Sequence, residues 1–416
     1  MTDVKEAETQ DYKLYPYRWV VLGVFMLMVF AIQPLWISYS PIIAKASEFY
    51  GVDYLRIGWF SMLFMLVFLP FSLPASWAID TWGFKKSVSL GAVLLGVFGL
   101  LRGLIGHTYP LALACTLGIA LAQPLLLNSW VKLPMLWFGV KERASVIGMI
   151  LMANTLGTIL GSLLTPYLLD TMGMSIPAVQ TAYGAFAAFS SLLFLVFAKE
   201  KPETPPAPAH EQVRTNFFDG TKLAFKNPVF LLFLFTIFAG MGVFNGVTTW
   251  VGAIVGPRGF SAQQAGLLIS LMLLAGVFGS QTLPRFSDKE GKRQKYIFIG
   301  YLFSIIGIAG ITFARQSWLL YGSAALLGFF LIGSNPVALQ YGAEVAKPTP
   351  EGTTAGIIQL VGQASVVFVY LMEALKGKDG SFTSALLLAI GLMTVSLFII
   401  TRLKDPSKAS SADELD

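Results

Sequence analysis

Residues 80–86 read Asp-Thr-Trp-Gly-Phe-Lys-Lys, and residues 288–293 read Asp-Lys-Glu-Gly-Lys-Arg. In both stretches a glycine stands three positions after the aspartate, and two cations follow it. One stretch comes directly after the second long apolar run of the chain, and the other comes after the eighth. We therefore interpret the chain as a tandem repeat of two halves, each with six hydrophobic segments and one short charged turn.

The composition of the chain predicts a membrane protein. Of its 416 residues, 55% are apolar and 12% are charged, and the charged share is about half of what is usual for a soluble domain. A soluble fold could not cover so much apolar surface, whereas a bilayer can. The formal net charge of +6 comes from basic residues in short turns between apolar runs, which argues against a nucleic-acid-binding patch.

The scarcity of cysteine and histidine limits the chemistry of the chain. The single cysteine, Cys115, lies inside an apolar run, and the two histidines, His107 and His210, lie in a short loop and in a Pro-rich stretch. The sequence therefore offers no Cys/His metal set and no convergent Ser/His/Asp or Cys/His catalytic set. We expect no catalytic residue, no metal and no cofactor, and we expect that the chain is not an enzyme.

About twelve apolar runs are long enough to cross a bilayer, which takes roughly 20 helical residues. They cover residues 18–44, 57–79, 87–106, 110–137, 144–169, 178–198, 229–255, 262–287, 294–314, 318–346, 353–376 and 381–402. The expected organisation is a cytoplasmic N-terminal tail (1–17), an N-terminal six-helix bundle (18–198), a cytoplasmic linker (199–228), a C-terminal six-helix bundle (229–402) and a disordered tail (403–416).

The distribution of basic residues predicts the orientation of these helices. Lysine and arginine are about three times as frequent in the turns that share a side with the N-terminus and the linker as in the opposite turns, so both termini should be cytoplasmic. Two six-helix halves, each with one charged turn, resemble the major facilitator type of secondary transporter, in which the halves face each other across a central solute path.

The charged turns are candidate gates at the cytoplasmic ends of the second and eighth helices. The glycine allows a tight turn, and the aspartate can cap a neighbouring helix or pair with a cation, which would hold one state of a transporter closed. The expected partners of Asp80 are Lys141 and Arg143. The candidate gating residues are Asp80, Gly83, Lys85, Lys86, Lys141, Arg143, Asp288, Gly291, Lys292 and Arg293.

Ionisable residues within the helices are scarce. Lys132 lies near the cytoplasmic end of the fourth helix, and Glu344 lies near the end of the tenth. A charge at membrane depth costs a few kcal/mol, so each is a functional candidate. We expect Lys132 to face the protein interior, where it pairs with a neighbouring acid or carbonyl or attracts an anion; snorkelling to the interface is the alternative.

Aromatic and amide side chains are more common than charges at mid-membrane. They suit a cavity for a small polar solute or an organic cation, because aromatic faces attract cations, whereas a carboxylate solute would favour a mid-membrane arginine. The helix that carries Thr155 also carries Asn154. The candidate solute-binding residues are Gln33, Trp36, Tyr39, Gln123, Asn128, Thr155, Phe244, Asn245, Trp250 and Gln363.

Several motifs are more specific than the general repeat. They are Trp19-Val20-Val21, Gln33 with Trp36, Ile37 and Tyr39, Phe49 to Asp53, Trp59 to Leu66, Ala122-Gln123, Trp137-Phe138-Gly139, and Pro350 to Gly356 leading to Gln363. Together they resemble the feline leukaemia virus subgroup C receptor family, whose animal members are linked to choline and ethanolamine transport, to haem export and, in a relative, to pyridoxine.

This resemblance implies that Trp36 and Gln363 contact the solute. The chain departs from the family where a glutamine appears as Thr155 and where a tyrosine appears as Asn245, and both departures put choline itself in doubt. It also departs from the general major facilitator turn, because Ser76 and Pro284 replace its first glycine and Thr81 replaces its arginine.

The sequence thus predicts an all-α membrane protein with twelve transmembrane helices in two pseudo-symmetric six-helix bundles. We expect a monomeric secondary transporter that moves a small polar organic solute, such as an organic cation, an amine or a vitamin-like compound, by alternating access. The alternatives are a monocarboxylate or organic-anion facilitator of the same fold and a non-transporting membrane receptor or sensor. The short ends of the chain favour a prokaryotic inner or plasma membrane.

Overall fold

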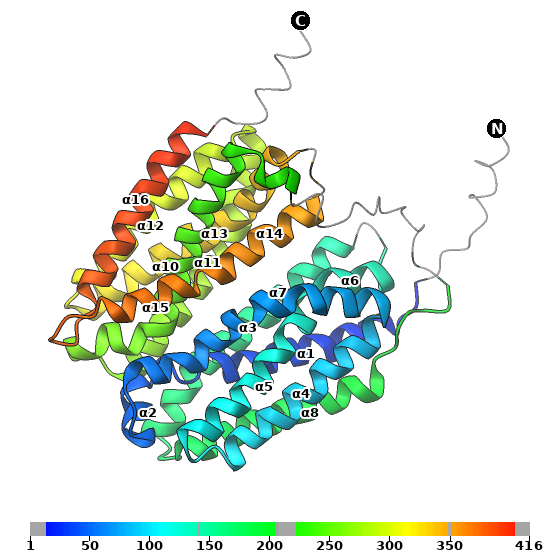
Figure 1. Cartoon of the computed structure of the whole chain (residues 1–416), viewed down its shortest axis with the longest axis horizontal. Helices are drawn as coiled ribbons and strands as arrows, with labels where there is room; N and C mark the ends of the chain where they lie inside the picture. The colour runs from blue at the N-terminus through cyan, green and yellow to red at the C-terminus, as the bar shows by residue number, and fades with distance from the viewer. Residues whose placement is uncertain are drawn as a thin grey trace, which may run out of the picture. The chain divides into compact units, whose positions relative to one another are not determined.

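The structure is a computed structural model, and it describes residues 14–139, 142–204, 206, 222–347, 349 and 351–403. Over these residues the chain contains helices and no β-strand, and twelve helices are long and apolar enough to cross a membrane (Figure 1). The predicted fold class is therefore confirmed. Lys141, residues 1–13, most of the predicted linker and residues 404–416 lie outside the described residues.

The first half contains α1 (Arg18–Ile37), α2 (Ile43–Tyr50), α3 (Tyr54–Thr81), α4 (Phe84–Leu104), α5 (Tyr109–Leu127), α6 (Ser129–Trp137), α7 (Arg143–Asp170) and α8 (Ile176–Phe197). The second half contains α10 (Pro228–Val255), a 3₁₀ turn η2 (Gly256–Arg258), α11 (Ala262–Glu290), α12 (Arg293–Phe313), α13 (Ser317–Val345), α14 (Glu351–Ala364), α15 (Val366–Ala374) and α16 (Thr383–Arg402). We call the side of the bilayer on which α1 begins the proximal side and the side on which α1 ends the distal side.

Large apolar side chains point outward from the helices. Phe278, Trp318 and Phe398 expose 67%, 70% and 69% of their surface. An apolar surface of this kind is rare on soluble monomers but suits contact with lipid, and a helix can enter lipid because its backbone hydrogen bonds are satisfied internally. The exposed apolar residues therefore agree with the membrane assignment.

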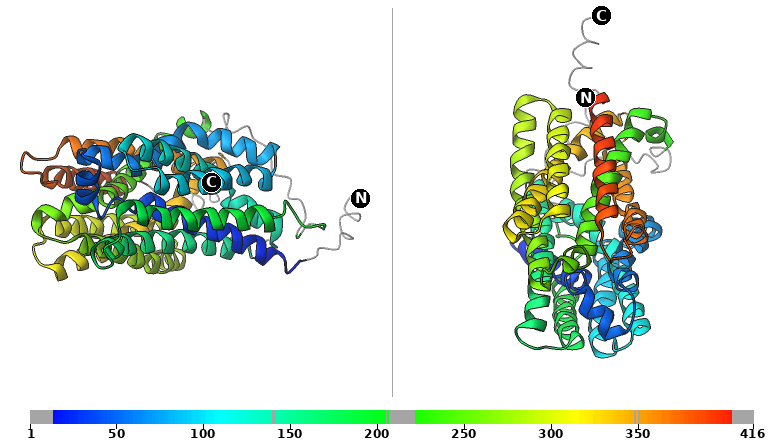
Figure 2. Two further views of the ribbon diagram at one scale, coloured as in Figure 1. Left: turned by 90° about the horizontal axis from the view of Figure 1, so that it is seen from below. Right: turned by 90° about the vertical axis from the view of Figure 1, so that its left-hand side faces the viewer.

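The chain forms two compact units. The first consists of Met1–Leu35, Pro70–Thr158 and Ser175–Val213, and the second consists of Trp36–Leu69, Ile159–Met174 and Arg214–Asp416. In the first unit α4 packs along α8 (Figure 1), and the buried rings of Phe25, Phe84 and Phe194 fill the core beside them. Figure 2 gives two further views of the helices. In the second unit α13 packs along both α11 and α12.

The first predicted span, residues 18–44, is shorter as a helix than its apolar run. Helix α1 ends at Ile37, and residues 38–42 form a turn before α2 begins. Pro41 explains the turn, because proline has no N–H to donate and disfavours helical backbone at the residue before it.

The fourth and eleventh predicted spans are each divided in two. Helices α5 and α6 meet at Asn128, one turn after Pro124, whose missing N–H weakens the helix there. Helices α14 and α15 meet at Ser365, whose N–H donates to Gly362 O in a tighter turn than an α-helix makes. Both junctions place a polar side chain inside a membrane-spanning segment.

Candidate functional site

Gln33 of α1 is held by two side chains of α7 in the first unit. It is 7% exposed, its Nε2 donates to Asn154 Oδ1 at 2.5 Å, and its Oε1 accepts from Thr158 Oγ1 at 3.1 Å. Both ends of the amide are thus used inside the protein. The sequence predicts a solute-binding role for Gln33, and the structure gives it partners that connect two helices of one half.

Asn245 of α10 has a matching position in the second unit. It is 6% exposed, and its Nδ2 donates to Ser365 Oγ at 3.1 Å, at the junction of α14 and α15. Helices one and five of the first half correspond to helices seven and eleven of the whole chain. The two buried amides therefore join corresponding helix pairs in the two repeats.

Asn128 connects the fourth spanning helix to the second. Its Nδ2 donates to Ser72 O at 2.8 Å and to Ser76 Oγ at 2.9 Å, both on α3. Its amide nitrogen is thus engaged between helices of one half. Ser72 and Ser76 are partners that the sequence analysis did not find, because a serine in an apolar helix carries no sign of the residue it faces.

Four predicted solute-binding side chains are half-buried and, within the described part of the chain, make no side-chain hydrogen bond: Trp36, Gln123, Phe244 and Gln363. Gln123 belongs to the first unit, and the other three belong to the second. The Oε1 atom of Gln123 is buried and receives no hydrogen bond from the described residues. These side chains keep their capacity for a ligand, whereas the hydroxyl of Thr155 donates to Leu151 O of its own helix at 3.0 Å.

Two predicted aromatic candidates are enclosed by protein. Tyr39 is 1% exposed, stacks on Phe60 with ring centroids 4.3 Å apart, and shares a hydrogen bond of 2.9 Å with the hydroxyl of Tyr50. Trp250 is 0% exposed, and its indole N–H donates to Val369 O at 2.8 Å. In this structure both rings are packing residues of the second unit.

The first charged turn pairs with a residue other than the expected ones. Asp80 Oδ1 accepts from Lys132 Nζ of α6 at 2.7 Å. The expected partner Arg143 instead donates to the carbonyls of Phe138 and Met135 at the end of α6, where a cation is favoured by the helix dipole. The expectation of an Asp80–Arg143 pair was therefore wrong for this structure, and the expected second partner, Lys141, lies outside the described residues.

Glu200 is a partner of this turn that the sequence analysis missed. Its carboxylate accepts from the backbone N–H groups of Phe84 at 2.7 Å and of Lys85 at 2.6 Å, at the start of α4. Gly83 has φ +94°, and a Cβ there would lie 2.5 Å from Glu200 Oε1. The glycine is thus required both by the backbone and by the seated carboxylate. The side chains of Lys85 and Lys86 form no ion pair in the described part of the chain.

The second charged turn is closed by an arginine of the turn itself. Arg293 pairs with Asp288 and, through Nε at 3.3 Å, with Glu344 of α13, and its side chain is 13% exposed. Gly291 ends α11 in the left-handed conformation with φ +64°, and Lys292 precedes α12. The fourth spanning helix thus supplies a cation to one turn, while the tenth supplies an anion to the other.

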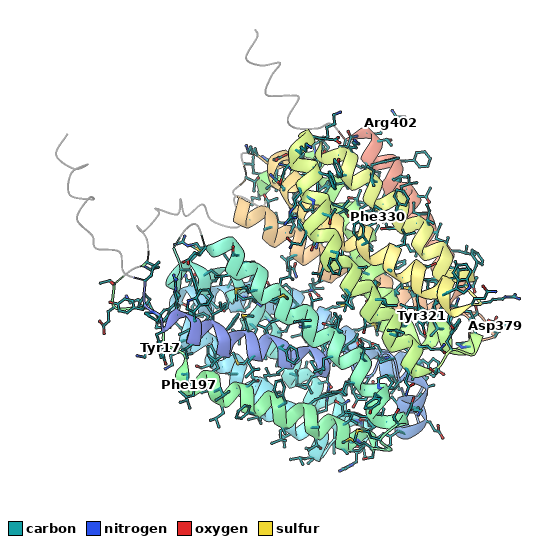
Figure 3. All side chains as sticks on the ribbon, turned by 180° about the vertical axis from the view of Figure 1, so that it is seen from behind. Tyr17, Phe197, Tyr321, Phe330, Asp379 and Arg402 are labelled. Carbon is teal, nitrogen blue, oxygen red and sulfur yellow. The ribbon has the colours of Figure 1, made fainter. Side chains whose placement is uncertain are left out.

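The proximal end of the first unit is held by further contacts of residues next to α1. Figure 3 labels Tyr17 and Phe197, and the hydroxyl of Tyr17 donates to Phe197 O at 2.7 Å. Arg18 makes a two-pronged pair with Glu142, with contacts of 2.6 and 3.2 Å. The start of α1 is therefore attached to the end of α8 and to the start of α7.

Comparison with known proteins adds family information. A family model described as Major Facilitator Superfamily matches residues 20–370. The chain is similar to the choline/ethanolamine transporter FLVCR2 of Rattus norvegicus, at 26% identity over 400 residues that cover 91% of this chain and 73% of the relative. It is similar to the choline/ethanolamine transporter FLVCR1 of Felis catus at 27% identity, covering 87% and 67%.

Among solved structures, the crystal structure of a D-xylose–proton symporter is similar with a TM-score of 0.74 and 13% identity, covering 94% of this chain and 99% of the other. At that identity the likeness bears on the fold alone.

Proposed function

The chain belongs to the Major Facilitator Superfamily, and from this premise we propose that it moves a small polar organic solute with an amine or ammonium group across the membrane by alternating access. It is an integral multi-pass membrane protein and a secondary transporter, not an enzyme. The resemblance to the feline leukaemia virus subgroup C receptor family is confirmed by the relatives found in rat and cat.

The observation that carries the proposal is a set of half-buried side chains of the second unit. Trp36 and Gln363 make no side-chain hydrogen bond to the described residues, and Phe244 adds an aromatic ring. Trp36 and Phe244 offer aromatic faces, which attract an organic cation. Gln363 offers an amide oxygen, which accepts hydrogen bonds from an ammonium or a hydroxyl. Choline and ethanolamine, the solutes in the names of the relatives, combine these two groups.

The anion alternative is weakened by the position of Lys132. An anion facilitator needs a cation near the solute path, and Lys132 was the candidate for that cation. The ammonium of Lys132 is instead paired with Asp80. A carboxylate solute would have to displace this pairing.

The departures from the family change the expected solute preference. Asn245 stands where the family has a tyrosine, and its amide is bonded to Ser365, so Phe244 is the aromatic candidate on that helix. Thr155 replaces a glutamine. Compared with the family, the site thus has one aromatic hydroxyl and one amide fewer at these two positions. We therefore propose that the site favours small amines and does not single out choline.

We further propose that the proximal side is cytoplasmic, that both termini lie there and that a monomer is sufficient for transport. The excess of basic residues in the proximal turns supports the orientation, and the presence of both six-helix halves in one chain supports the monomer.

A thermal-shift screen of the purified protein against choline, ethanolamine, other amines, pyridoxine and monocarboxylates tests the proposed function. A bound solute stabilises the folded state, by about 2.7 kcal/mol at a concentration 100 times its Kd. At least one amine should raise the Tm of the parent and of Trp77→Ala, a lipid-exposed tryptophan control (58% exposed), but not that of Trp36→Ala. Stabilisation by carboxylates alone would contradict the proposal.

A further inference from the structure

The ring of Trp250 is fixed by residues of the second half. It lies near the distal end of α10, its indole N–H donates to Val369 O of α15 at 2.8 Å, and its ring centroid is 5.6 Å from that of Phe382. The polar group of the side chain is therefore satisfied within its own half, and the ring has one fixed orientation.

The edge of this ring rests on Gly58 of α3, which belongs to the first half. A Cβ at Gly58 would overlap the six-membered ring of Trp250 and would lie 2.8 Å from its Cζ3. Real Cβ atoms do not approach this closely, so the seat accepts the ring only because glycine has no side chain. The indole ring of Trp250 thus packs directly on the backbone of Gly58, and the contact between these two residues is a van der Waals contact.

Two other contacts join the two halves within the second compact unit. The N–H of Gly252 donates to Ser40 O at a long 3.3 Å. Farther along, Ser162 Oγ of α7 and Ser270 Oγ of α11 are 2.9 Å apart. All these residues belong to the second compact unit, and each contact joins a distal segment of the first half to a distal segment of the second.

We propose that Trp250 is the distal gate of this transporter and that Gly58 is its seat. In alternating access the contacts between halves must break when the distal side opens. The ring can leave Gly58 without losing a hydrogen bond, because its N–H stays bonded to Val369; a group bonded across the halves would become unsatisfied on opening. The inference goes beyond the proposed function, since it holds for any solute.

A cross-linking experiment tests the gate without a solute. Ser162→Cys and Ser270→Cys are introduced together into a Cys115→Ser background, with a protease site inserted within residues 207–221 so that a disulfide keeps the cleaved halves together. The disulfide forms when the distal side is closed. Gly58→Leu should lower the cross-linking rate about tenfold, which corresponds to about 1.4 kcal/mol, because overpacking destabilises the closed distal side.

The controls distinguish a gate from general damage. Gly148→Leu adds the same bulk at a glycine of α7 with no atom within 4 Å of its Cβ position and should leave the rate unchanged. Combining Gly58→Leu with Trp250→Ala removes the clash and should restore cross-linking toward the parent rate. If Gly58→Leu is not recovered as folded protein, Gly58→Ala is used in its place. A parent-like rate in the Gly58 variant, or no restoration in the double variant, would overturn the proposal.

Discussion

Gln33 and Trp36 lie three positions apart on α1 and have different surroundings. Gln33 is bonded at both ends of its amide to Asn154 and Thr158, whereas Trp36 is half-buried and its side chain has no hydrogen-bond partner in the described part of the chain. The first residue therefore stabilises a helix pair, and the second remains available to a solute.

Substitution of these two residues should separate stability from binding. Gln33→Ala leaves Asn154 and Thr158 without their partner, so we expect a loss of about 1–3 kcal/mol of folding stability with the order of preferred amines unchanged. Trp36→Ala should show the opposite behaviour, with little change in stability and loss of amine binding. Thermal unfolding with and without each amine measures both effects. Equal loss of binding in the two variants would show that Gln33 also contacts the solute.

Lys132 provides a second test at this scale. Its pair with Asp80 is partly exposed, with side-chain exposures of 33% and 69%, and such pairs contribute about 0–1 kcal/mol. We expect Lys132→Gln to change the Tm little and to leave the preference for amines over carboxylates intact. If the variant instead loses binding of a carboxylate that stabilises the parent, Lys132 is an anion site and the anion alternative is favoured.

The sequence indicates which polar and aromatic residues are candidates for the site, but it does not indicate which residues they bond to. The aromatic and amide positions are readable because they interrupt apolar runs, but Asn128, Asn245 and Gln33 have partners on other helices. Serine and threonine are common in apolar helices without a cross-helix partner, so the sequence could not indicate which of them receives an amide. The role of Glu200 was not predictable either, because this residue lies more than a hundred positions along the sequence from the N–H groups that donate to it.

Among the elements, the start of α4 shows how the linker is attached to a charged turn. Glu200 follows the end of α8 and binds the first N–H groups of α4, where a negative charge also interacts favourably with the helix dipole. Any movement of α4 relative to α8 would break these bonds. The turn at Gly83 is therefore part of the joint between the first bundle and the linker.

Gly83→Ala tests this joint. The substitution places a Cβ against Glu200 and requires a φ of +94° from a non-glycine residue, so we expect a loss of about 1–3 kcal/mol of stability. Thermal unfolding against the parent measures it, with Gly148→Ala as the control because its Cβ would enter open space. A Tm for Gly83→Ala equal to that of the control would mean that Glu200 does not occupy this seat.

Helix number was predictable, but helix interruptions were less so. Long apolar runs mark each crossing because the bilayer sets a minimum length. The end of α1 before Pro41 and the junctions at Asn128 and Ser365 fall inside such runs, and hydropathy alone does not register them. Proline gave a usable signal at two of the three places, whereas Ser365 gave none.

At the scale of the whole molecule, the repeat predicts two six-helix bundles, while the compact units group residues differently. Residues 36–69 and 159–174 belong with residues 214–416. The contacts of Trp250 with Gly58 and of Ser162 with Ser270 lie within this second unit. Such contacts depend on which side of a transporter is closed, and the sequence is the same in every state, so it cannot indicate them.

The central claim, that this chain transports small amines by alternating access, is tested most directly by uptake of radiolabelled choline and ethanolamine into proteoliposomes of the purified protein. We expect saturable uptake of at least one of them by the parent and by Trp77→Ala and none by Trp36→Ala. We also expect reversible arrest of uptake when the Ser162→Cys/Ser270→Cys pair is oxidised in the Cys115→Ser background. Uptake of neither amine by a folded protein that takes up carboxylates, or undiminished uptake after the pair is cross-linked, would contradict the claim.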